Sequence, residues 1–145
     1  MSGKSNGWAQ AVLAAFFQGV FSGAGSTIFQ NAASPATNLY MSLHTADPGP
    51  AGDQTTSEAA YTSYARVPVV RSAAGWTLTG ETITPVATII WPTATGGAET
   101  ETFWGIGLSL TGAGTLIYSG PISPTIAVAN SITPELTTLS TVVEA

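Results

Sequence analysis

The order of apolar and polar positions changes once along the chain, near residue 38. Before it, residues 8–21 are almost continuously apolar, and Gln10 and Gln18 lie on one narrow polar line at helical spacing. This pattern predicts a helix over about residues 8–21 that is apolar around most of its circumference and needs cover on more than one side. Gly23 and Gly25 are expected to end it, because glycine readily takes the left-handed conformation at helix C-termini.

The same segment also has the outline of a secretory signal. Lys4 precedes the apolar run and small residues follow it at positions 22–26. The two glutamines within the run favour instead a helix that is packed in the folded protein or against a partner. The run is also shorter than the roughly 20 apolar residues of a membrane span. We therefore expect no membrane partner.

From residue 38 onward, short runs rich in Thr, Val, Ile and aromatic residues alternate with Gly, Pro, Asn and Ser, which is typical of strands and turns. Apolar residues alternate with others over 39–43, which predicts a first strand with one core face. Pro68 places a second strand, over 61–70, at a sheet edge or at a bulge, because proline cannot donate to a ladder. Further strands are expected at 76–79, 86–91, 102–108, 115–119 and 136–143, with a hairpin turn at 112–114.

These elements define a fold class. About seven to eight strands spaced near ten residues apart predict a mainly β protein, a single antiparallel β-sandwich or jelly-roll-like domain with an N-terminal α-helix. The expected organisation is an N-terminal arm over residues 1–37 and a β-sandwich domain over residues 38–145.

The composition adds one constraint, because the chain is poor in charge. Only 8% of its 145 residues are charged, about a third of the share in a typical soluble domain. Disorder is excluded, since disordered chains combine high charge with low hydrophobicity. Three basic residues cannot neutralise a run of phosphates, which excludes generic nucleic-acid binding. Charge keeps surfaces apart, so an independent soluble monomer is not expected.

Candidate polar chemistry is sparse. His44 is the only histidine and the chain has no cysteine, so we expect a strand-end histidine bonded to a nearby turn rather than a general base or metal ligand. Asp47 and Asp53 could share a calcium ion, but the calcium-loop pattern of acidic residues is missing. Asp47-Pro48-Gly49 is instead typical of a turn.

A pair of carboxylates is the remaining catalytic candidate. Glu99 and Glu101 would share a face of an extended segment, and such pairs perform acid–base work in glycoside hydrolysis. Their position beside Gly96-Gly97 predicts a solvated strand start instead. Nucleophile-elbow, phosphate-loop and dinucleotide motifs are missing from the sequence. We expect no enzyme activity, no catalytic residue, no metal and no cofactor.

Aromatic residues and arginines are candidates for binding. The aromatic residues could stack on a carbohydrate, but their spacing follows the strands, so most are expected in the core. Arg66 and Arg71 are expected to be single ion-pair anchors, which matter most at an interface, where arginine is enriched among hot spots. The aromatic candidates are Tyr61, Tyr64, Trp76, Trp91, Phe103, Trp104 and Tyr118.

One stretch carries a family resemblance. Leu39-Tyr-Met-Ser-Leu-His-Thr-Ala-Asp-Pro-Gly49 resembles the LYxxLHTADPG opening of a family of small tailed-bacteriophage virion proteins, often labelled tail fibre proteins. Weaker similarities follow in the family's order, so the resemblance covers about residues 38–143, and the apolar helix before it could be an attachment element particular to this chain. The resemblance implies a virion structural protein without catalysis. The weaker similarities are Tyr64-Ala-Arg-Val67, Phe103-Trp-Gly-Ile-Gly107 (where Trp104 departs from the family pattern), Leu116-Ile-Tyr-Ser-Gly120 and residues 134–143.

The leading hypothesis is a capsid decoration (cement) protein, assembled in the host cytoplasm and located in the virion. It would bridge major capsid protein subunits and copies of itself, as a dimer or trimer, through contacts that add by multivalency. The alternatives are a tail, tail-fibre or baseplate component, and a carbohydrate-binding module that holds host glycans. The expected interface residues are Trp8, Val12, Phe16, Phe17, Val20, Phe21, Arg66 and Arg71, and Asp47, Pro48, Gly49 and Asp53 are expected in an exposed or contacting loop over 47–60.

Overall fold

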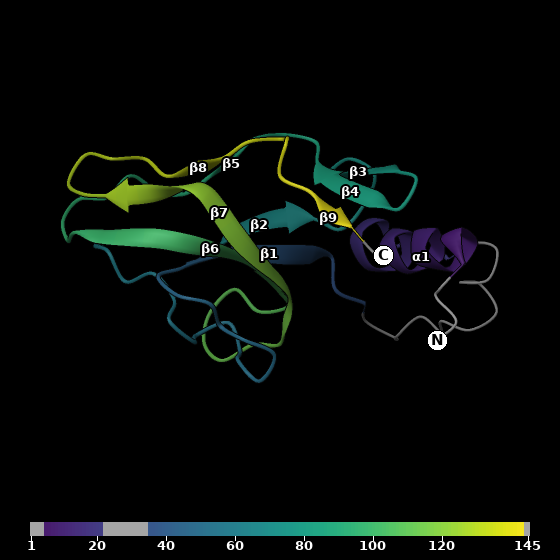
Figure 1. Ribbon diagram of the computed structural model, residues 1–145, viewed down its shortest axis with the longest axis horizontal. Helices are drawn as coiled ribbons and strands as arrows, with labels where there is room; N and C mark the ends of the chain where they lie inside the picture. The colour runs from purple at the N-terminus through teal and green to yellow at the C-terminus, as the bar shows by residue number, and fades with distance from the viewer. Residues whose placement is uncertain (1–4, 22–34, 144–145) are drawn as a thin grey trace. The chain divides into compact units, whose positions relative to one another are not determined.

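A computed structural model describes residues 5–21 and 35–143 (Figure 1). Within these ranges one helix precedes nine strands, which form three antiparallel sheets. The mainly β fold with an N-terminal helix, predicted from the sequence, is therefore confirmed. Contacts between residues divide the described chain into two compact units. The first is drawn from residues 1–37, 70–88 and 137–145, and the second from 38–69 and 89–136.

The first unit begins with helix α1 (Asn6–Leu13), which continues into a π-helical turn, η1 (Ala14–Gln18). The Ser5 side chain caps the helix by accepting a hydrogen bond from a backbone amide of the first turn. At the other end Gly19 takes a left-handed conformation with φ +67°. The predicted end at Gly23 and Gly25, which lie outside the described residues, is wrong. Gly19, which lies within the apolar run, already adopts the terminating conformation without steric cost.

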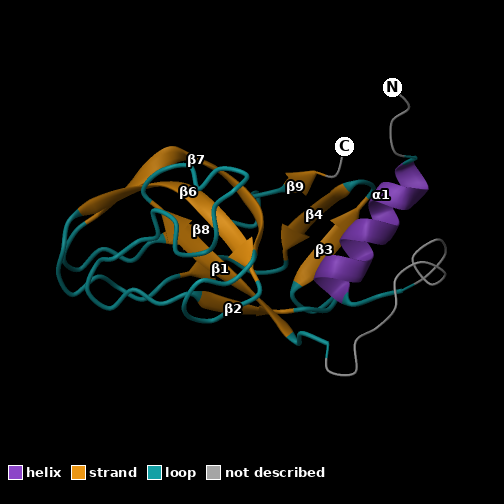
Figure 2. Cartoon of the chain, turned by 90° about the horizontal axis from the view of Figure 1, so that it is seen from below, coloured by secondary structure: helices purple, strands orange, loops and turns teal. Residues whose placement is uncertain are grey.

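A three-stranded sheet packs against this helix (Figure 2). The Phe17 ring meets the Trp76 ring edge-on, with centroids 4.7 Å apart, and both side chains are buried. The Gln18 side-chain amide donates to the Trp76 carbonyl at 3.0 Å. One side of the helix is thus fixed to the sheet by aromatic packing and a hydrogen bond. The strands, in sheet order, are β3 (Trp76–Thr79), β4 (Thr82–Pro85) and β9 (Val142–Val143).

The second unit is built on a four-stranded antiparallel sheet and a short separate pair of strands. Trp91, next to the short pair, is buried, and its indole N–H donates to the Met41 carbonyl of the larger sheet at 3.3 Å. The core of this unit therefore forms around Trp91. The four strands, in sheet order, are β2 (Val67–Val70), β1 (Asn38–His44), β6 (Glu99–Gly107) and β7 (Leu116–Val128), and the pair is β5 (Ile89–Ile90) with β8 (Glu135–Leu136).

Strand boundaries differ from the sequence prediction in several places. The single strand predicted over 136–143 is wrong, because this segment contributes β8 and β9 to two different sheets. Residues 61–66 form turns, so the second strand is confined to β2, at the sheet edge that Pro68 indicated. β4 was not predicted, and it forms because the Gly80 turn (φ +60°) folds the chain back on β3. β7 runs well past residue 119, since an edge strand tolerates its two prolines.

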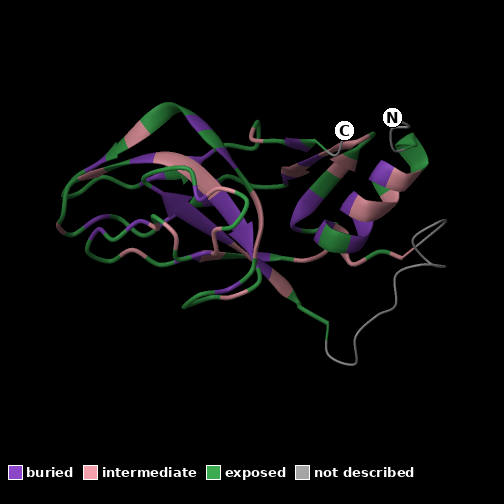
Figure 3. Ribbon diagram, turned by 60° about the horizontal axis from the view of Figure 1, so that its bottom comes forward, coloured by how far each residue is buried: buried purple, intermediate pink, exposed green. Residues whose placement is uncertain are grey.

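The first strand also differs in its burial (Figure 3). The predicted core face, with Leu39, Met41 and Leu43, is buried. Ser42 and His44 on the opposite face are equally inaccessible, each 0% exposed. The prediction of a single core face is therefore wrong, because the loop over residues 47–60 folds over the second face of β1.

Candidate functional site

The helix residues predicted to meet a partner have three kinds of environment. Phe17 belongs to the core of the first unit, whereas Phe16 and Val20 are 39% and 44% exposed. Trp8, Val12 and Phe21 are half-buried. The exposed apolar side chains of this segment are thus Phe16, in the last turn of the helix, and Val20, just after the helix ends.

Arg71 binds the C-terminal end of this helix. Its Nε donates to the Phe16 carbonyl at 2.6 Å and its Nη2 to the Ala15 carbonyl, while Nη1 donates to the Ala36 carbonyl at 3.3 Å. The guanidinium also lies 6.0 Å from the centroid of the Phe21 ring. A cation that satisfies the last helical carbonyls also interacts favourably with the helix dipole. Arg71 therefore fixes the helix end to the chain that precedes β1.

Replacing Arg71 by alanine is expected to lower the free energy of unfolding by about 1–3 kcal/mol, because hydrogen bonds from a charged donor are lost. Urea denaturation measures this loss, and amide chemical shifts over residues 15–21 report whether the helix end is disturbed. Arg71→Lys is the control. It keeps the charge without the guanidinium fork, and should restore less than half of the loss. An unchanged denaturation midpoint in Arg71→Ala would contradict the assignment.

Arg66 lies in the second unit at the centre of a buried polar cluster. The side chain pairs in bidentate fashion with Glu58, at 2.6 and 2.7 Å. Its Nη1 and Nη2 also donate to the carbonyls of Ser109 and Gly112, each at 2.9 Å. The Tyr64 hydroxyl donates to Glu58 at 2.9 Å, and burial raises the pKa of that hydroxyl. The predicted ion-pair anchor is confirmed for Arg66, which ties this segment to the loop between β6 and β7.

His44 has the environment that the sequence predicted. Its Nδ1 lies 2.8 Å from the Thr56 carbonyl and its Nε2 lies 2.8 Å from the Ser42 hydroxyl. Because the carbonyl only accepts, Nδ1 carries the proton and Nε2 accepts from the hydroxyl. Burial lowers the pKa of His44, which keeps the ring neutral. A Cβ at Gly105 would lie 2.6 Å from Nε2, so only glycine fits beside the ring.

The two loop aspartates each accept a hydrogen bond from a backbone amide of the turn in which they lie. Asp47 Oδ1 accepts from the Gly49 amide at 2.9 Å, and Asp53 Oδ1 accepts from the Thr55 amide at 2.8 Å. The predicted turn at Asp47-Pro48-Gly49 is therefore confirmed, with Gly49 at φ +69°. Asp47 is exposed, Gly49 and Asp53 are half-buried, and Pro48 is buried.

Gln54 anchors the middle of the same loop. It is fully buried, its side-chain Oε1 accepts from the Ser109 amide at 2.9 Å, and its backbone N–H donates to the Gly114 carbonyl at 3.0 Å. A Cβ at Gly107 would lie 2.0 Å from Gln54 Cδ. The loop is thus held against β6 by a side chain that fits only over glycine.

Replacing Gly107 by alanine is therefore expected to lower the free energy of unfolding by about 1–3 kcal/mol through overpacking. Thermal denaturation measures the loss, and adding Gln54→Ala to the variant should restore part of it. Gly7→Ala is the matched control, because a Cβ there meets no atom within 4 Å. Equal stability of the Gly107 and Gly7 variants would show that Gln54 does not fill this space.

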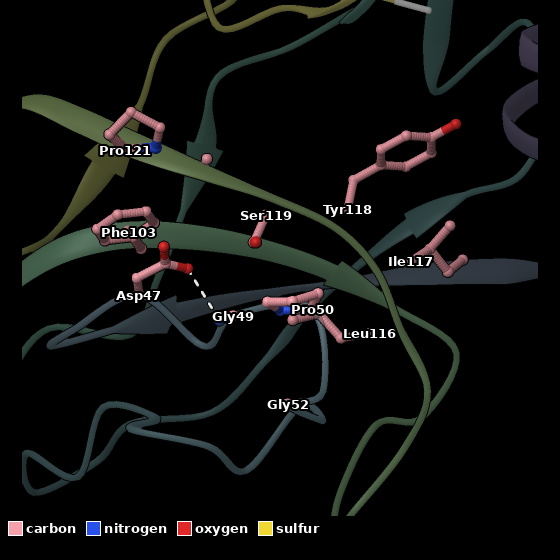
Figure 4. A pocket seen from close by; sticks show the side chains of 11 residues that line it. Asp47, Gly49, Pro50, Gly52, Phe103, Leu116, Ile117, Tyr118, Ser119 and Pro121 are labelled. Carbon is pink, nitrogen blue, oxygen red and sulfur yellow. Dashed lines mark hydrogen bonds between the residues drawn. The ribbon is translucent and has the colours of Figure 1, made fainter.

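An open pocket lies beside the first turn of this loop (Figure 4). Its volume is about 370 Å³, and β6, β7 and the turn at 47–52 line it. Phe103 and Pro121 are cross-strand partners in the β6–β7 register, and the next pair on the same face is Gly105 with Ser119. Asp47 and Pro50 line the pocket from the turn. The remaining lining residues are Gly49, Gly52, Leu116, Ile117, Tyr118 and Gly120.

The two glutamates at the start of β6 differ from each other. Glu99 accepts from the amides of Ala60 and Tyr61 at 2.8 and 2.7 Å. Glu101 is 0% exposed, and neither of its carboxyl oxygens has a hydrogen-bond partner among the residues described. Burial, followed by the charge of Glu99, raises the pKa of Glu101 to about 8. The prediction of a solvated strand start is wrong for Glu101, because the turn around Tyr61 covers this end of β6.

The aromatic candidates divide between core and surface. Tyr61, Trp76 and Trp91 are buried at 3% exposure or less. The other four candidates are half-buried. Of these, Phe103 lines the pocket with its ring (Figure 4). The predicted hairpin at 112–114 could have revealed part of this site, because it sets residue 103 opposite the returning strand, at Pro121.

In the parts of the chain that the structure describes, no helix is both long enough and apolar enough to cross a membrane. In the same parts, no group of three or more His, Cys, Asp or Glu side chains is arranged to hold a metal ion.

The chain was compared with models of known protein families. The model of a protein family described as "Podophage GP4 fiber I protein gp80" matches residues 3–143. No curated protein matches the chain. Because the match begins at residue 3, the apolar helix lies within the region that the family shares. The expectation of an attachment element particular to this chain is therefore wrong.

Proposed function

Because the chain belongs to the family of the podophage GP4 fiber I protein gp80, we propose that it is a structural component of a virion fibre. The observation that carries this proposal is the extent of the match, which includes the helix as well as both units of the β-rich body. The protein acts without catalysis and is located in the virion.

The surface of the first unit supports assembly with other subunits. Phe16 and Val20 leave apolar area open on the helix, in a chain with little charge to keep neighbouring surfaces apart. Burial of apolar area is the main favourable term in subunit association. The proposed partners are copies of this chain and adjoining virion proteins.

The position and number of copies in the virion test this proposal. Quantitative mass spectrometry of purified particles, together with electron microscopy of particles that carry an antibody to the protein, should give few copies, located at the tail. Hundreds of copies spread over the head would overturn the fibre role. That result would favour the capsid decoration role, in which the protein bridges major capsid protein subunits.

Replacing Phe16 and Val20 together by serine is expected to lower the number of copies of the protein per particle at least tenfold. The protein should stay folded, because these side chains are exposed. Occupancy is measured by immunoblotting of purified particles. Leu139→Ser is the matched control, since Leu139 is an 86% exposed apolar residue of the same unit.

Deletion of residues 1–25 should also abolish incorporation into particles. Normal occupancy of the truncated protein on particles would contradict a role for the helix in attachment.

A further inference from the structure

The pocket beside the turn at 47–52 combines apolar ring surfaces with polar groups. Since cross-strand partners share a face of a sheet, Phe103 and Pro121 present neighbouring rings on the same side of β6 and β7. Pro50 and Asp47 line the pocket from the turn, and Phe103 lines it from β6 (Figure 4). The Ser119 hydroxyl adds a group that can both donate and accept hydrogen bonds.

The turn that forms one wall is held in place. Asp47 Oδ1 binds the Gly49 amide, and the Gly52 amide donates to the Gly49 carbonyl at 3.2 Å. A Cβ at Gly52 would lie 2.2 Å from the Pro48 carbonyl oxygen, so the turn closes only with glycine there. Two residues later the buried Gln54 fixes the loop to β6. The wall is therefore formed before a ligand arrives, which lowers the cost of binding.

The charge of the pocket selects the class of ligand. Among the described residues that line the pocket there is no Lys, Arg or His, and Asp47 is the one carboxylate. An anion would be repelled by that carboxylate. The bond to Gly49 uses Oδ1, while Oδ2 belongs to an exposed side chain that can accept from a ligand hydroxyl. The volume of about 370 Å³ falls within the range of small-ligand sites.

We propose that this pocket binds a neutral saccharide. The apolar C–H face of one sugar ring packs on Phe103, and its hydroxyl groups hydrogen-bond to Asp47 and Ser119. The proposal is independent of the protein's position in the virion, because every group it uses belongs to the second unit of a single chain.

The test is a titration of the full-length, ¹⁵N-labelled protein, followed by amide chemical shifts. The probes are methyl α-D-glucopyranoside, methyl β-D-galactopyranoside and N-acetyl-D-glucosamine, each up to about 50 mM, because a single sugar ring binds in the millimolar range. At least one probe should produce saturable shifts confined to residues 47–52, 103 and 116–121. An absence of saturable shifts with all three probes would overturn the proposal.

Two variants test the assigned contacts. Asp47→Asn keeps an acceptor for the Gly49 amide but removes the charge, and Phe103→Leu keeps an apolar side chain but removes the ring. Each should weaken binding at least tenfold while the amide spectrum stays that of a folded protein. Glu135→Gln is the matched control, since Glu135 is an exposed carboxylate of the same unit. Unchanged binding in both pocket variants would overturn the proposal.

A cationic ligand is the competing outcome, because a carboxylate beside an aromatic ring also suits an organic cation. Methylguanidinium and n-butylammonium are titrated under the same conditions. Saturable pocket shifts with these cations, and none with the sugars, would show a site for basic side chains and overturn the saccharide assignment.

Discussion

Replacing Arg66 by alanine is expected to lower the free energy of unfolding by about 3–5 kcal/mol. The Arg66 and Glu58 side chains are 2% and 16% exposed, so the substitution leaves a carboxylate with little access to water and without its partner. It also removes the donors to the carbonyls of Ser109 and Gly112. Urea denaturation, followed by tryptophan fluorescence, measures the loss.

A double-mutant cycle separates the ion pair from the packing of the arginine side chain. Arg66→Met and Glu58→Met each leave one partner behind, whereas the double variant removes both charges. The double variant should lose less free energy of unfolding than the two single variants lose in sum. A loss below about 1 kcal/mol in Arg66→Ala, the level of an exposed ion pair, would show that the cluster is solvated in solution.

The free energy of unfolding is expected to fall as pH rises, because Glu101 loses its proton, and replacing Glu101 by glutamine is expected to remove this fall. The pKa of the carboxyl is about 8 in the folded chain, against an ordinary value of 4.5. The folded chain thus holds a proton that the unfolded chain releases, and its contribution to stability is complete below pH 4.5. The contribution falls from there and is lost above about pH 8. The whole change amounts to about 2–5 kcal/mol.

His44 gives the opposite slope. Burial lowers its pKa below the ordinary value of 6.5, so its contribution is present above pH 6.5 and is lost as pH falls through the folded pKa. The two groups together predict maximal stability in mildly acidic solution. Glutamine at position 101 should flatten the alkaline side of the profile and leave the acidic side unchanged.

The measurement is the free energy of unfolding from pH 4 to pH 9, taken for both proteins. Glu135→Gln is the control, because Glu135 is exposed and its neutralisation should leave the profile unchanged. If the Glu101→Gln protein loses stability between pH 5 and pH 8 as steeply as the unsubstituted protein, Glu101 is not the group responsible.

Local patterns were sufficient for part of the fold. The strand at Trp76–Thr79 was predicted with its observed bounds, and the hairpin at 112–114 does join β6 to β7. Both depend on neighbouring residues, since alternation and turn glycines act over a few positions. β4 (Thr82–Pro85) was missed because its pairing with β3 depends on the turn at Gly80, which the sequence pattern did not indicate.

Burial of polar residues could not be predicted in the same way. Acidic residues are rarely buried, so an exposed Glu101 was the reasonable expectation, and only the turn around Tyr61 reverses it. Arg66 was correctly expected to form an ion pair, but its partner Glu58 was not identified. The pocket is a further case, since Asp47 and Phe103 line it together although they are far apart in the sequence.

The position of β7 bears on how the protein avoids aggregation at the high local concentration at which virion proteins assemble. It is a long strand at the edge of its sheet, and a free edge of that length can recruit the edges of other copies into fibrillar aggregates. Pro121 and Pro124 lie within it and carry no amide hydrogen, so they interrupt the row of donors that such growth needs. Orderly assembly is thereby directed to side-chain surfaces and away from a shared, continuous sheet.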